Sequence, residues 1–212
     1  MPDSFPQYHN REIVDVRPKR VSLDPRRPYS LLVEPEHNAS GSIVDVATLF
    51  LTNRECPFRC LMCDLWKHTL EVSVDIGDIP EQIRWGLDEL PPASEIKLYN
   101  SGNFFDPKAI PPEDYLAIAN LVRGFENVIV ENHPNLTNER CLEFRDLIAP
   151  ATLEVALGLE TCHPQVLKSL NTQMTLADFE RATRFLNGEG IRTRAFLLLK
   201  PPFLNEEEAV EW

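Results

Sequence analysis

Residues 44–68 read VDVATLFLTNRECPFRCLMCDLWKH, and this segment sets the kind of domain that the chain forms. Its first ten residues are mostly apolar and β-branched, which is typical of a buried strand. Three cysteines follow, Cys56, Cys60 and Cys63, with the spacing CxxxCxxC. A chain of this composition contains that spacing by chance in well under about one sequence in a hundred, so the spacing is a specific signal. The segment therefore predicts a strand that leads directly into a cysteine loop.

Beyond this segment, short apolar runs alternate with longer segments of helical periodicity. We expect strands at residues 44–53, 95–101, 127–132, 153–161 and 191–200. We expect helices at residues 79–90, 111–125, 138–148 and 175–190. The alternation predicts an α/β fold with a parallel sheet, which either curls into a barrel with the helices outside or stays open. In both cases the carboxyl ends of the strands form the active face.

Length and composition place the chain among ordinary globular proteins. It has 212 residues, of which 43% are hydrophobic and 25% are charged. A chain of this kind buries a sizeable core, which excludes disorder and fibrous repeats. The 21 basic and 33 acidic side chains give a net charge of -12, which opposes a large surface for phosphate groups.

Residues 1–43 form an extension rich in proline and arginine, which we separate from a core at residues 44–212. The extension lacks sustained periodicity, so at most a short strand is expected in it. Its basic stretch at residues 11–27 leaves two interpretations open, a nucleic-acid contact and an ordinary solvated face. No apolar run approaches the roughly 18 to 20 residues that cross a bilayer, and the N-terminus lacks the apolar core of a signal peptide. We therefore expect a soluble, cytoplasmic protein with no membrane partner.

The cysteine spacing favours metal binding over disulfides. Three of the five cysteines fall within eight residues, which suits a metal ligand set in a reducing compartment. Three thiolates from one loop can hold three corners of an iron-sulfur cube and leave the fourth iron without a protein ligand. An open coordination position of this kind distinguishes a catalytic metal centre from a closed structural one.

A zinc site is the alternative that the residues leave open. His68 follows Cys63 at a distance found in zinc-binding loops and would complete a Cys3His set. A zinc knuckle usually forms a small module with little core, whereas this loop leaves the carboxyl end of a strand in a large α/β domain. The location favours catalysis.

A CxxxCxxC loop after a first strand resembles the cluster loop of the radical S-adenosylmethionine (radical SAM) superfamily, and the later strand ends extend the resemblance over most of residues 44–212. The resemblance implies a partial (β/α) barrel with parallel strands and outer helices. It implies a [4Fe-4S] cluster on Cys56, Cys60 and Cys63, with SAM chelated to the open iron. One electron then cleaves SAM, and the resulting 5'-deoxyadenosyl radical abstracts hydrogen from a substrate. An electron donor such as a flavodoxin or a ferredoxin is implied as a partner.

The end of the second expected strand carries residues that the resemblance assigns to SAM. LYNSGNFFD at residues 98–106 stands where the family usually has a Gly-Gly-Glu type segment, so Ser101, Gly102 and Asn103 are expected near the SAM amino group. Asparagine replaces the acidic residue, and we therefore expect backbone carbonyls to bind. Taken alone, the segment is an ordinary turn. Met62 stands where the family usually has an aromatic residue, and it offers a polarizable apolar surface to adenine.

The later strands add five candidates. Glu131 ends the third expected strand and is either a site carboxylate or a surface one. Gly158 and Glu160 share one face of the fourth strand by the period-two rule. The resemblance implies that Gly158 admits the nucleoside and that Glu160 contacts the ribose hydroxyls, with a surface carboxylate as the alternative. In the fifth strand, Leu198 is expected to pack on adenine, and Lys200 either meets a carboxylate or phosphate or is an exposed lysine.

VALGLET (155–161), TLADFERA (175–182) and AFLLLKPP (195–202) resemble the branch that includes the elongator catalytic subunit, the methylthiotransferases and the archaeosine-synthesis radical enzyme. That branch mostly modifies tRNA, so tRNA is implied as a candidate substrate. A zinc-stabilised binding module and a core that serves only as an interaction domain are the alternative functions. The family core has a sixth strand, whereas this chain ends in NEEEAVEW at residues 205–212. We therefore expect a barrel truncated after the fifth strand.

Overall fold

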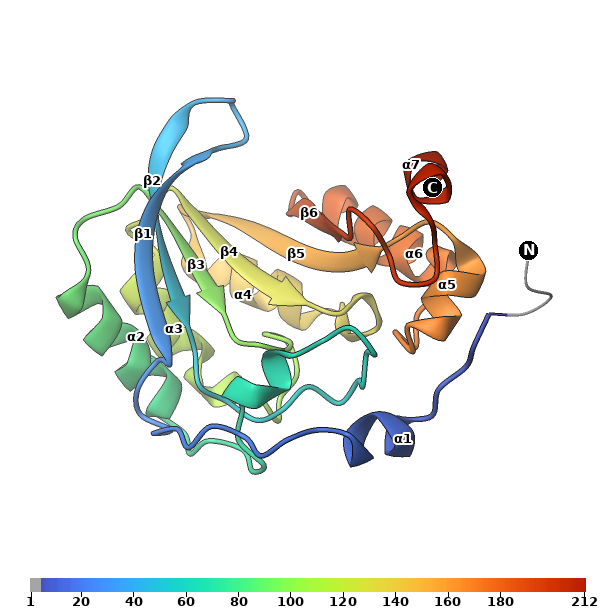
Figure 1. Ribbon diagram of the computed structural model, residues 1–212. Helices are drawn as coiled ribbons and strands as arrows, with labels where there is room; N and C mark the ends of the chain where they lie inside the picture. Colours follow the sequence, from blue (N-terminus) through green and yellow to red (C-terminus); the bar gives the residue numbers. More distant parts are fainter. Residues whose placement is uncertain (1–4) are drawn as a thin grey trace.

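The computed structural model describes residues 5–212 and shows an open sheet of six strands in the order β1-β2-β3-β4-β5-β6 (Figure 1). The strands are β1 Ser30–His37, β2 Ile43–Phe50, β3 Glu95–Tyr99, β4 Asn127–Asn132, β5 Thr152–Glu160 and β6 Arg192–Leu197. β1 pairs with β2 in antiparallel fashion, and every later neighbouring pair is parallel. The first four residues of the expected extension lie outside the described range.

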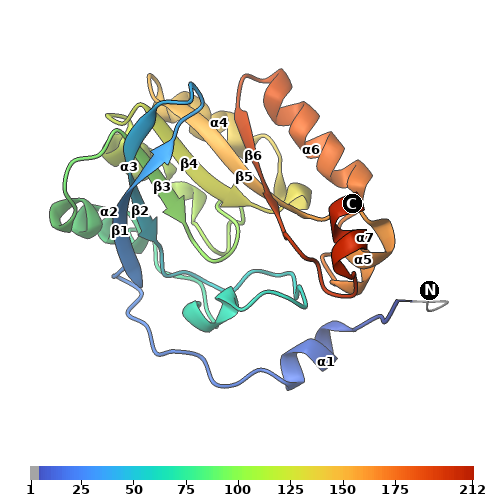
Figure 2. The same ribbon diagram turned by 45° about the horizontal axis from the view of Figure 1, so that its top comes forward.

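Four longer helices cover one face of the sheet (Figures 1 and 2). They are α2 Asp78–Glu89, α3 Tyr115–Val122, α4 Arg140–Ile148 and α6 Leu176–Gly188. The shorter helices are α1 Asn10–Asp15, α5 Pro164–Ser169 and α7 Glu206–Glu211, and 3-10 turns span Leu65–His68, Pro112–Asp114 and Pro134–Leu136. Within residues 5–212, no helix combines the length and the apolar character needed to cross a membrane.

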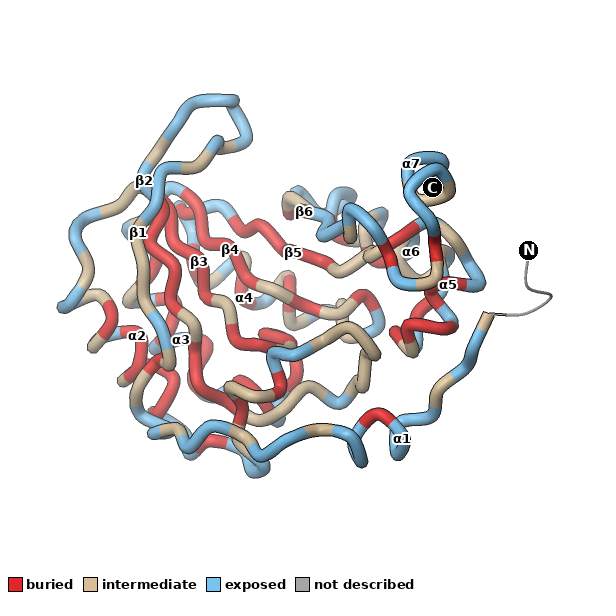
Figure 3. Tube along the Cα trace, in the orientation of Figure 1, coloured by how far each residue is buried: buried red, intermediate tan, exposed pale blue. Residues whose placement is uncertain are grey.

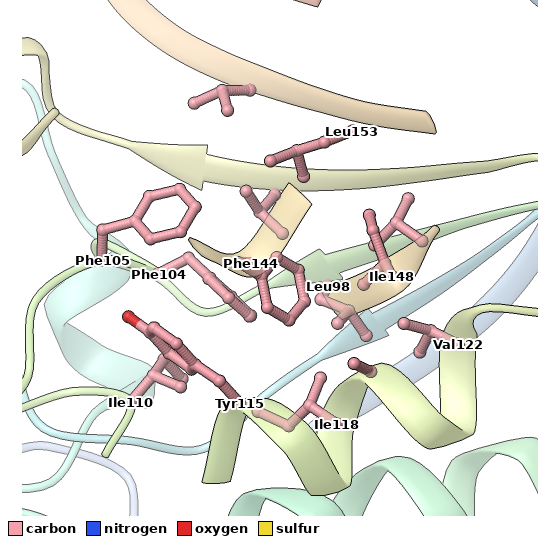
Figure 4. Packing of buried hydrophobic residues seen from close by; sticks show 14 of the residues in the cluster. Leu98, Phe104, Phe105, Ile110, Tyr115, Ile118, Val122, Phe144, Ile148 and Leu153 are labelled. Carbon is pink, nitrogen blue, oxygen red and sulfur yellow. The ribbon is translucent and has the colours of Figure 1, made fainter. Parts of the chain in front are cut away.

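The core lies between the sheet and these four helices. Alternate strand residues point into it, such as Ile96 and Leu98 of β3, because successive side chains of a strand face opposite sides. Aromatic rings fill the space behind β3 and β4, with the ring centroids of Phe104 and Phe144 4.8 Å apart (Figure 4). Figure 3 shows buried residues concentrated along the central strands. Each fully buried large apolar side chain contributes about 1.5–3 kcal/mol, so this layer holds the strands and their ends in place.

The expected strands and helices are confirmed, and most of their ends lie one to three residues from the expected ones. The first expected strand ends at Phe50 and the fifth at Leu197, because the chain leaves the sheet before the cysteines and before Pro201. Residues 111–125 form a 3-10 turn followed by α3. The short strand of the extension is β1, which pairs with β2 along its whole length.

The face of the sheet opposite the core carries charged side chains. Lys97 of β3 and Glu154 of β5 alternate with core residues and therefore share this face, and Arg194 of β6 joins them through its pairing with Glu154. Lys97 Nζ pairs with Glu36 of β1, and Arg194 Nε donates to Glu154 Oε1 at 2.6 Å. These ion pairs link strands at both ends of the sheet.

Candidate active site

A cavity of about 160 Å³ lies at the carboxyl ends of the parallel strands. It brings together residues that are far apart in the sequence. Of the predicted site residues, its wall contains Cys56, Cys60, Cys63, Ser101, Gly102, Asn103, Glu131, Gly158 and Glu160. A larger cavity of about 650 Å³, formed by α5 and the start of α6, adjoins it at Met174. The smaller cavity is the candidate site because it holds the three thiols.

The three thiols are free and partly buried. Burial raises the pKa of Cys56 to about 11 and the pKa of Cys60 to about 12, and it also raises the pKa of Cys63. All three are therefore protonated at neutral pH in the metal-free protein. Because a metal binds the thiolate, loading of this site releases protons and becomes easier as the pH rises.

The donor set fits a cluster better than a single ion. Among residues 5–212, no three His, Cys, Asp or Glu side chains surround one point closely enough for a single metal ion. His68 lies beside Tyr29, with ring centroids 4.8 Å apart, and is not part of the cavity wall. Three thiols that face a shared cavity suit an iron-sulfur cluster, in which each thiolate binds a different iron.

A group of arginines holds the start of the cysteine loop, residues 54–68. Glu55 accepts a hydrogen bond from Arg17 Nη1 at 2.7 Å, pairs with Arg20, and lies 3.2 Å from Arg59 Nη1. The Arg17 guanidinium also lies over the Trp66 ring, 4.8 Å from its centroid. Burial raises the pKa of Glu55, but the arginines outweigh burial and hold it below its usual range. In both Figures 1 and 2 the blue N-terminal chain runs along the teal cysteine loop.

Part of the basic stretch of the extension is paired with carboxylates of the core. Arg26 Nε lies 3.3 Å from Asp78 Oδ1, and Arg27 Nη1 lies 3.3 Å from Glu81 Oε1, both on α2. Together with the pairing of Arg17 and Arg20 to Glu55, these contacts attach the extension to the core. Arg26 and Arg27 remain partly solvent-exposed, as an ordinary solvated face predicts, and the nucleic-acid contact stays a prediction.

The middle of the cysteine loop packs against residues that follow β4 and α5. The ring of Phe58 stacks on the imidazole of His133, with centroids 3.6 Å apart. His133 Nδ1 accepts the N–H of Asn135 at 3.1 Å, so Nε2 carries the proton and donates to the carbonyl oxygen of Thr172 at 2.9 Å. Burial lowers the pKa of His133, which keeps the ring neutral. Asn171 Nδ2 donates to the Arg59 carbonyl at 2.7 Å and completes this side of the loop.

Glu131 supports the loop that follows β3. Its Oε1 accepts the backbone N–H of Asn100 at 2.7 Å and that of Gly102 at 3.3 Å. Burial raises the pKa of Glu131 to about 7, although these hydrogen bonds lower it. Ser101 has a φ of 50°, in the left-handed region, and its hydroxyl lies 2.6 Å from the Tyr29 hydroxyl. The carboxyl of Glu131 and the turn at Ser101 thus form one hydrogen-bonded unit in the cavity wall.

Gly158 and Glu160 are coupled through a bulge at the end of β5. The pairing with β6 shifts register between these two residues, and Glu160 has a φ of 68°. A Cβ added at Gly158 would lie 2.5 Å from Glu160 Oε1, so the missing side chain makes room for the Glu160 carboxylate. Burial raises the pKa of Glu160, and none of the hydrogen bonds among residues 5–212 uses its carboxylate. The group is free to meet a ligand.

Three predicted residues lie away from this cavity. Met62 and Leu198 pack against the small apolar cluster of Val166, Leu170 and Leu204. This happens because the chain leaves β6 at Leu197 and turns over α5.

Lys200 is exposed in the same turn, with Nζ 3.4 Å from Glu206 Oε1. Seven further wall residues were not among the predicted site residues: Leu65, Asn132, His133, Ala156, Thr172, Met174 and Phe196. Phe196 lies two residues after Arg194 in β6, so both side chains are on the open face of the sheet. The period-two pattern of β6 could therefore have identified Phe196 as a wall residue. Thr172 and Met174 follow α5, a helix that periodicity did not reveal.

The sequence profile described as the radical SAM superfamily matches residues 51–212. The chain belongs to the radical SAM superfamily. The resemblance seen in the cysteine loop and the strand ends is confirmed, and the chain is an enzyme of radical SAM type. Members of this family use a [4Fe-4S] cluster and SAM.

Relatives of this radical SAM protein include two proteins named archaeosine synthase subunit beta. That of Thermococcus kodakarensis is 32% identical over 121 residues, which cover 55% of this chain and 37% of the relative. That of Methanosarcina acetivorans is 33% identical over 125 residues, which cover 57% of this chain and 36% of the relative. An uncharacterized protein of Methanocaldococcus jannaschii is 23% identical over 206 residues, which cover 91% of this chain and 56% of the relative. The chain thus matches about half or less of the length of these relatives.

A solved structure shares the radical SAM fold of this chain. It is a queuine lyase from Clostridium spiroforme bound to SAM and queuine, with a TM-score of 0.53 and 16% identity. The match covers 88% of this chain and 87% of the lyase. At this identity the similarity supports the fold, and the open sheet of six strands with flanking helices is consistent with it.

Proposed function

We propose that Cys56, Cys60 and Cys63 hold a [4Fe-4S] cluster whose fourth iron binds SAM. When bound, the cluster supplies the electron that cleaves SAM to methionine and a 5'-deoxyadenosyl radical, which takes a hydrogen atom from the substrate. The observation that carries the proposal is the shared cavity, in which the three thiols face the ends of β3, β4 and β5.

The residues of the cavity wall have distinct proposed roles. Backbone carbonyls of Ser101, Gly102 and Asn103 receive the SAM amino group, since their loop adjoins Cys56. Glu160 accepts hydrogen bonds from the ribose hydroxyls, because its carboxylate is free and partly buried. Glu131 supports the cofactor loop from behind, because its Oε1 already accepts two backbone N–H groups.

Met62, Leu198 and Lys200 were also expected at SAM. None of the three belongs to the cavity wall, so their contact with SAM stays a prediction. In our proposal, Phe196 takes the place of Leu198 as the apolar residue at adenine. A large apolar ring beside Gly158 suits the flat surface of adenine.

The proposed substrate class is RNA, with modification of a tRNA nucleotide as the reaction. The support comes from the two relatives named archaeosine synthase subunit beta. Their name also suggests a second subunit as a partner. A flavodoxin or ferredoxin is the proposed electron donor, since the cluster needs one electron per cleavage.

Anaerobic reconstitution with iron and sulfide, followed by reduction in the presence of SAM, tests the proposal. We expect about four irons per chain and release of 5'-deoxyadenosine. Single substitution of Cys56, Cys60 or Cys63 by Ser should abolish iron retention, while Cys162→Ser, at an exposed thiol, should leave it unchanged. Tight zinc without iron would support the binding module instead, and a cluster without SAM cleavage would support the interaction domain.

A further inference from the structure

Asn103 directs its side-chain amide at a cysteine sulfur. Its Nδ2 lies 3.1 Å from Cys56 Sγ, and the residue is 2% exposed. A thiolate can only accept hydrogen bonds, and an asparagine amide can donate them. The contact therefore suits Cys56 in its deprotonated, metal-bound form.

The surrounding loop leaves this amide little freedom. Gly102 packs on Cys56, so that a Cβ added at Gly102 would lie 3.6 Å from the Cys56 Cβ. The backbone on either side of Asn103 is tied to Glu131, whose Oε1 accepts the Gly102 N–H and whose carbonyl accepts the Phe104 N–H at 2.9 Å. The Asn103 carbonyl itself accepts the N–H of Asp106 at 3.2 Å. The side chain is thus held beside Cys56 by contacts that do not involve a ligand.

The three thiols differ in their hydrogen-bond donors. Each thiol is approached by backbone N–H groups: that of Phe58 at Cys56, that of Cys60 itself at Cys60, and those of Leu65 and Trp66 at Cys63. Among the side-chain hydrogen bonds within residues 5–212, the one that reaches a cluster-loop sulfur comes from Asn103. Cys56 is therefore the thiol on which a single substitution can act.

We propose that Asn103 donates an N–H···S hydrogen bond to the Cys56 thiolate of the bound cluster and raises the reduction potential of that cluster. The inference rests on the proposed function, because it needs a cluster on these cysteines. Reduction adds negative charge to the cluster and its thiolates, and a donor beside a thiolate stabilises the more negative state. A carboxylate in the same place would repel the thiolate, which gives a physical reason for asparagine at this position.

The test is a redox titration of the reconstituted cluster in the absence of SAM. Electron paramagnetic resonance measures the fraction of reduced cluster at each potential. It compares the parent with Asn103→Leu, which keeps the size and removes the donor, and with Asn103→Asp, which replaces the donor by a negative charge. Asn187→Leu, at an exposed residue of α6, is the matched control.

At the midpoint potential of the parent, we expect the ratio of reduced to oxidised cluster in Asn103→Leu to fall about tenfold, equivalent to about 59 mV for one electron. Asn103→Asp should shift the ratio further in the same direction. The control should match the parent. An Asn103→Leu protein with the potential of the control would overturn the proposal.

A second variant covers a leucine protein that does not retain its cluster. In that case Asn103→Asp carries the test, and a potential equal to that of the control would contradict the inference. A parent that takes up no iron overturns both proposals together, whereas a loaded parent with an unchanged variant potential overturns this one alone.

Discussion

Glu36 Oε2 in β1, the first strand of the sheet, lies 3.4 Å from Arg194 Nη1 in β6, the last strand. The two edges of the open sheet therefore meet across its uncovered face. Lys97 in the central strand β3 pairs with the same carboxylate, and Arg194 also pairs with Glu154. These ion pairs link β1, β3, β5 and β6 on that face.

Glu36→Gln should destabilise the fold in a pH-dependent way. Burial raises the pKa of Glu36, but Lys97 and Arg194 outweigh burial and lower it. A carboxyl with a lowered pKa stabilises the fold above its unfolded pKa and loses this contribution as the pH falls through the folded value. We expect the variant to lose about 1–3 kcal/mol of unfolding free energy at neutral pH. The difference from the parent should begin to shrink as the pH falls below the ordinary pKa of a glutamate and vanish below the lowered folded pKa.

Urea unfolding at several pH values measures this effect. Glu34→Gln, on an exposed neighbour in β1, serves as the control and should behave like the parent. A difference between Glu36→Gln and the parent that stays constant from neutral to acid pH would show that the ion pairs are not its source.

Glu55→Gln should loosen the N-terminal segment from the cysteine loop. The substitution leaves Arg17, whose side chain is 10% exposed, without its negative partner. Breaking a buried ion pair on one side typically costs about 3–5 kcal/mol. Chemical unfolding should show a loss near the lower end of that range, and trypsin should cleave faster after Lys19 and Arg20, because the bond after Arg17 precedes Pro18 and resists trypsin. Glu71→Gln, at an exposed carboxylate, should change neither property, and an equal effect of both variants would argue against the role of Glu55.

Glu131 should make the stability of the protein fall as the pH rises from the ordinary pKa of a glutamate toward neutrality. Its pKa of about 7 in the fold lies above the ordinary value, so its stabilising contribution is complete at acid pH and is lost as the pH rises through the folded value. A single group changes the free energy of unfolding by at most about 1.4 kcal/mol per pH unit. Glu131→Gln keeps an oxygen for the Asn100 N–H and should remove this slope, which lies between the ordinary pKa of 4.5 and the folded pKa of about 7. Parallel stability curves for parent and variant would contradict the raised pKa.

Substitutions of Glu160 should separate cofactor binding from backbone strain. Glu160→Gln and Glu160→Gly both remove the carboxylate, so both should weaken SAM binding by about 1–3 kcal/mol. Only glycine adopts the φ of 68° at this bulge without strain, so Glu160→Gly should be more stable than Glu160→Gln by about 1 kcal/mol. Calorimetric titration with SAM and thermal unfolding measure the two quantities. Parent-like affinity in either variant would remove Glu160 from the cofactor site.

Local sequence patterns were sufficient for the parallel strands, for the four longer helices and for the grouping of candidate residues at strand ends. Period-two alternation placed Gly158 and Glu160 on one face of β5, and strand endings placed Ser101 and Glu131 at the same edge of the sheet. These patterns work because parallel strands bring their carboxyl ends to one side whatever the details of packing. The spacing of Cys56, Cys60 and Cys63 was informative for a different local reason. All three lie in one short loop, so their closeness in the sequence already brings them close in space.

Long-range contacts depended on the tertiary structure. Asn103 meets Cys56 across 47 residues, Arg17 meets Glu55 across 38, and Arg194 meets Glu36 across 158. Periodicity reports which face of its own element a residue occupies, but not which distant side chain lies opposite. Those partners follow from strand register, sheet curvature and the bulge in β5, which arise only when the elements pack together and bury their apolar faces.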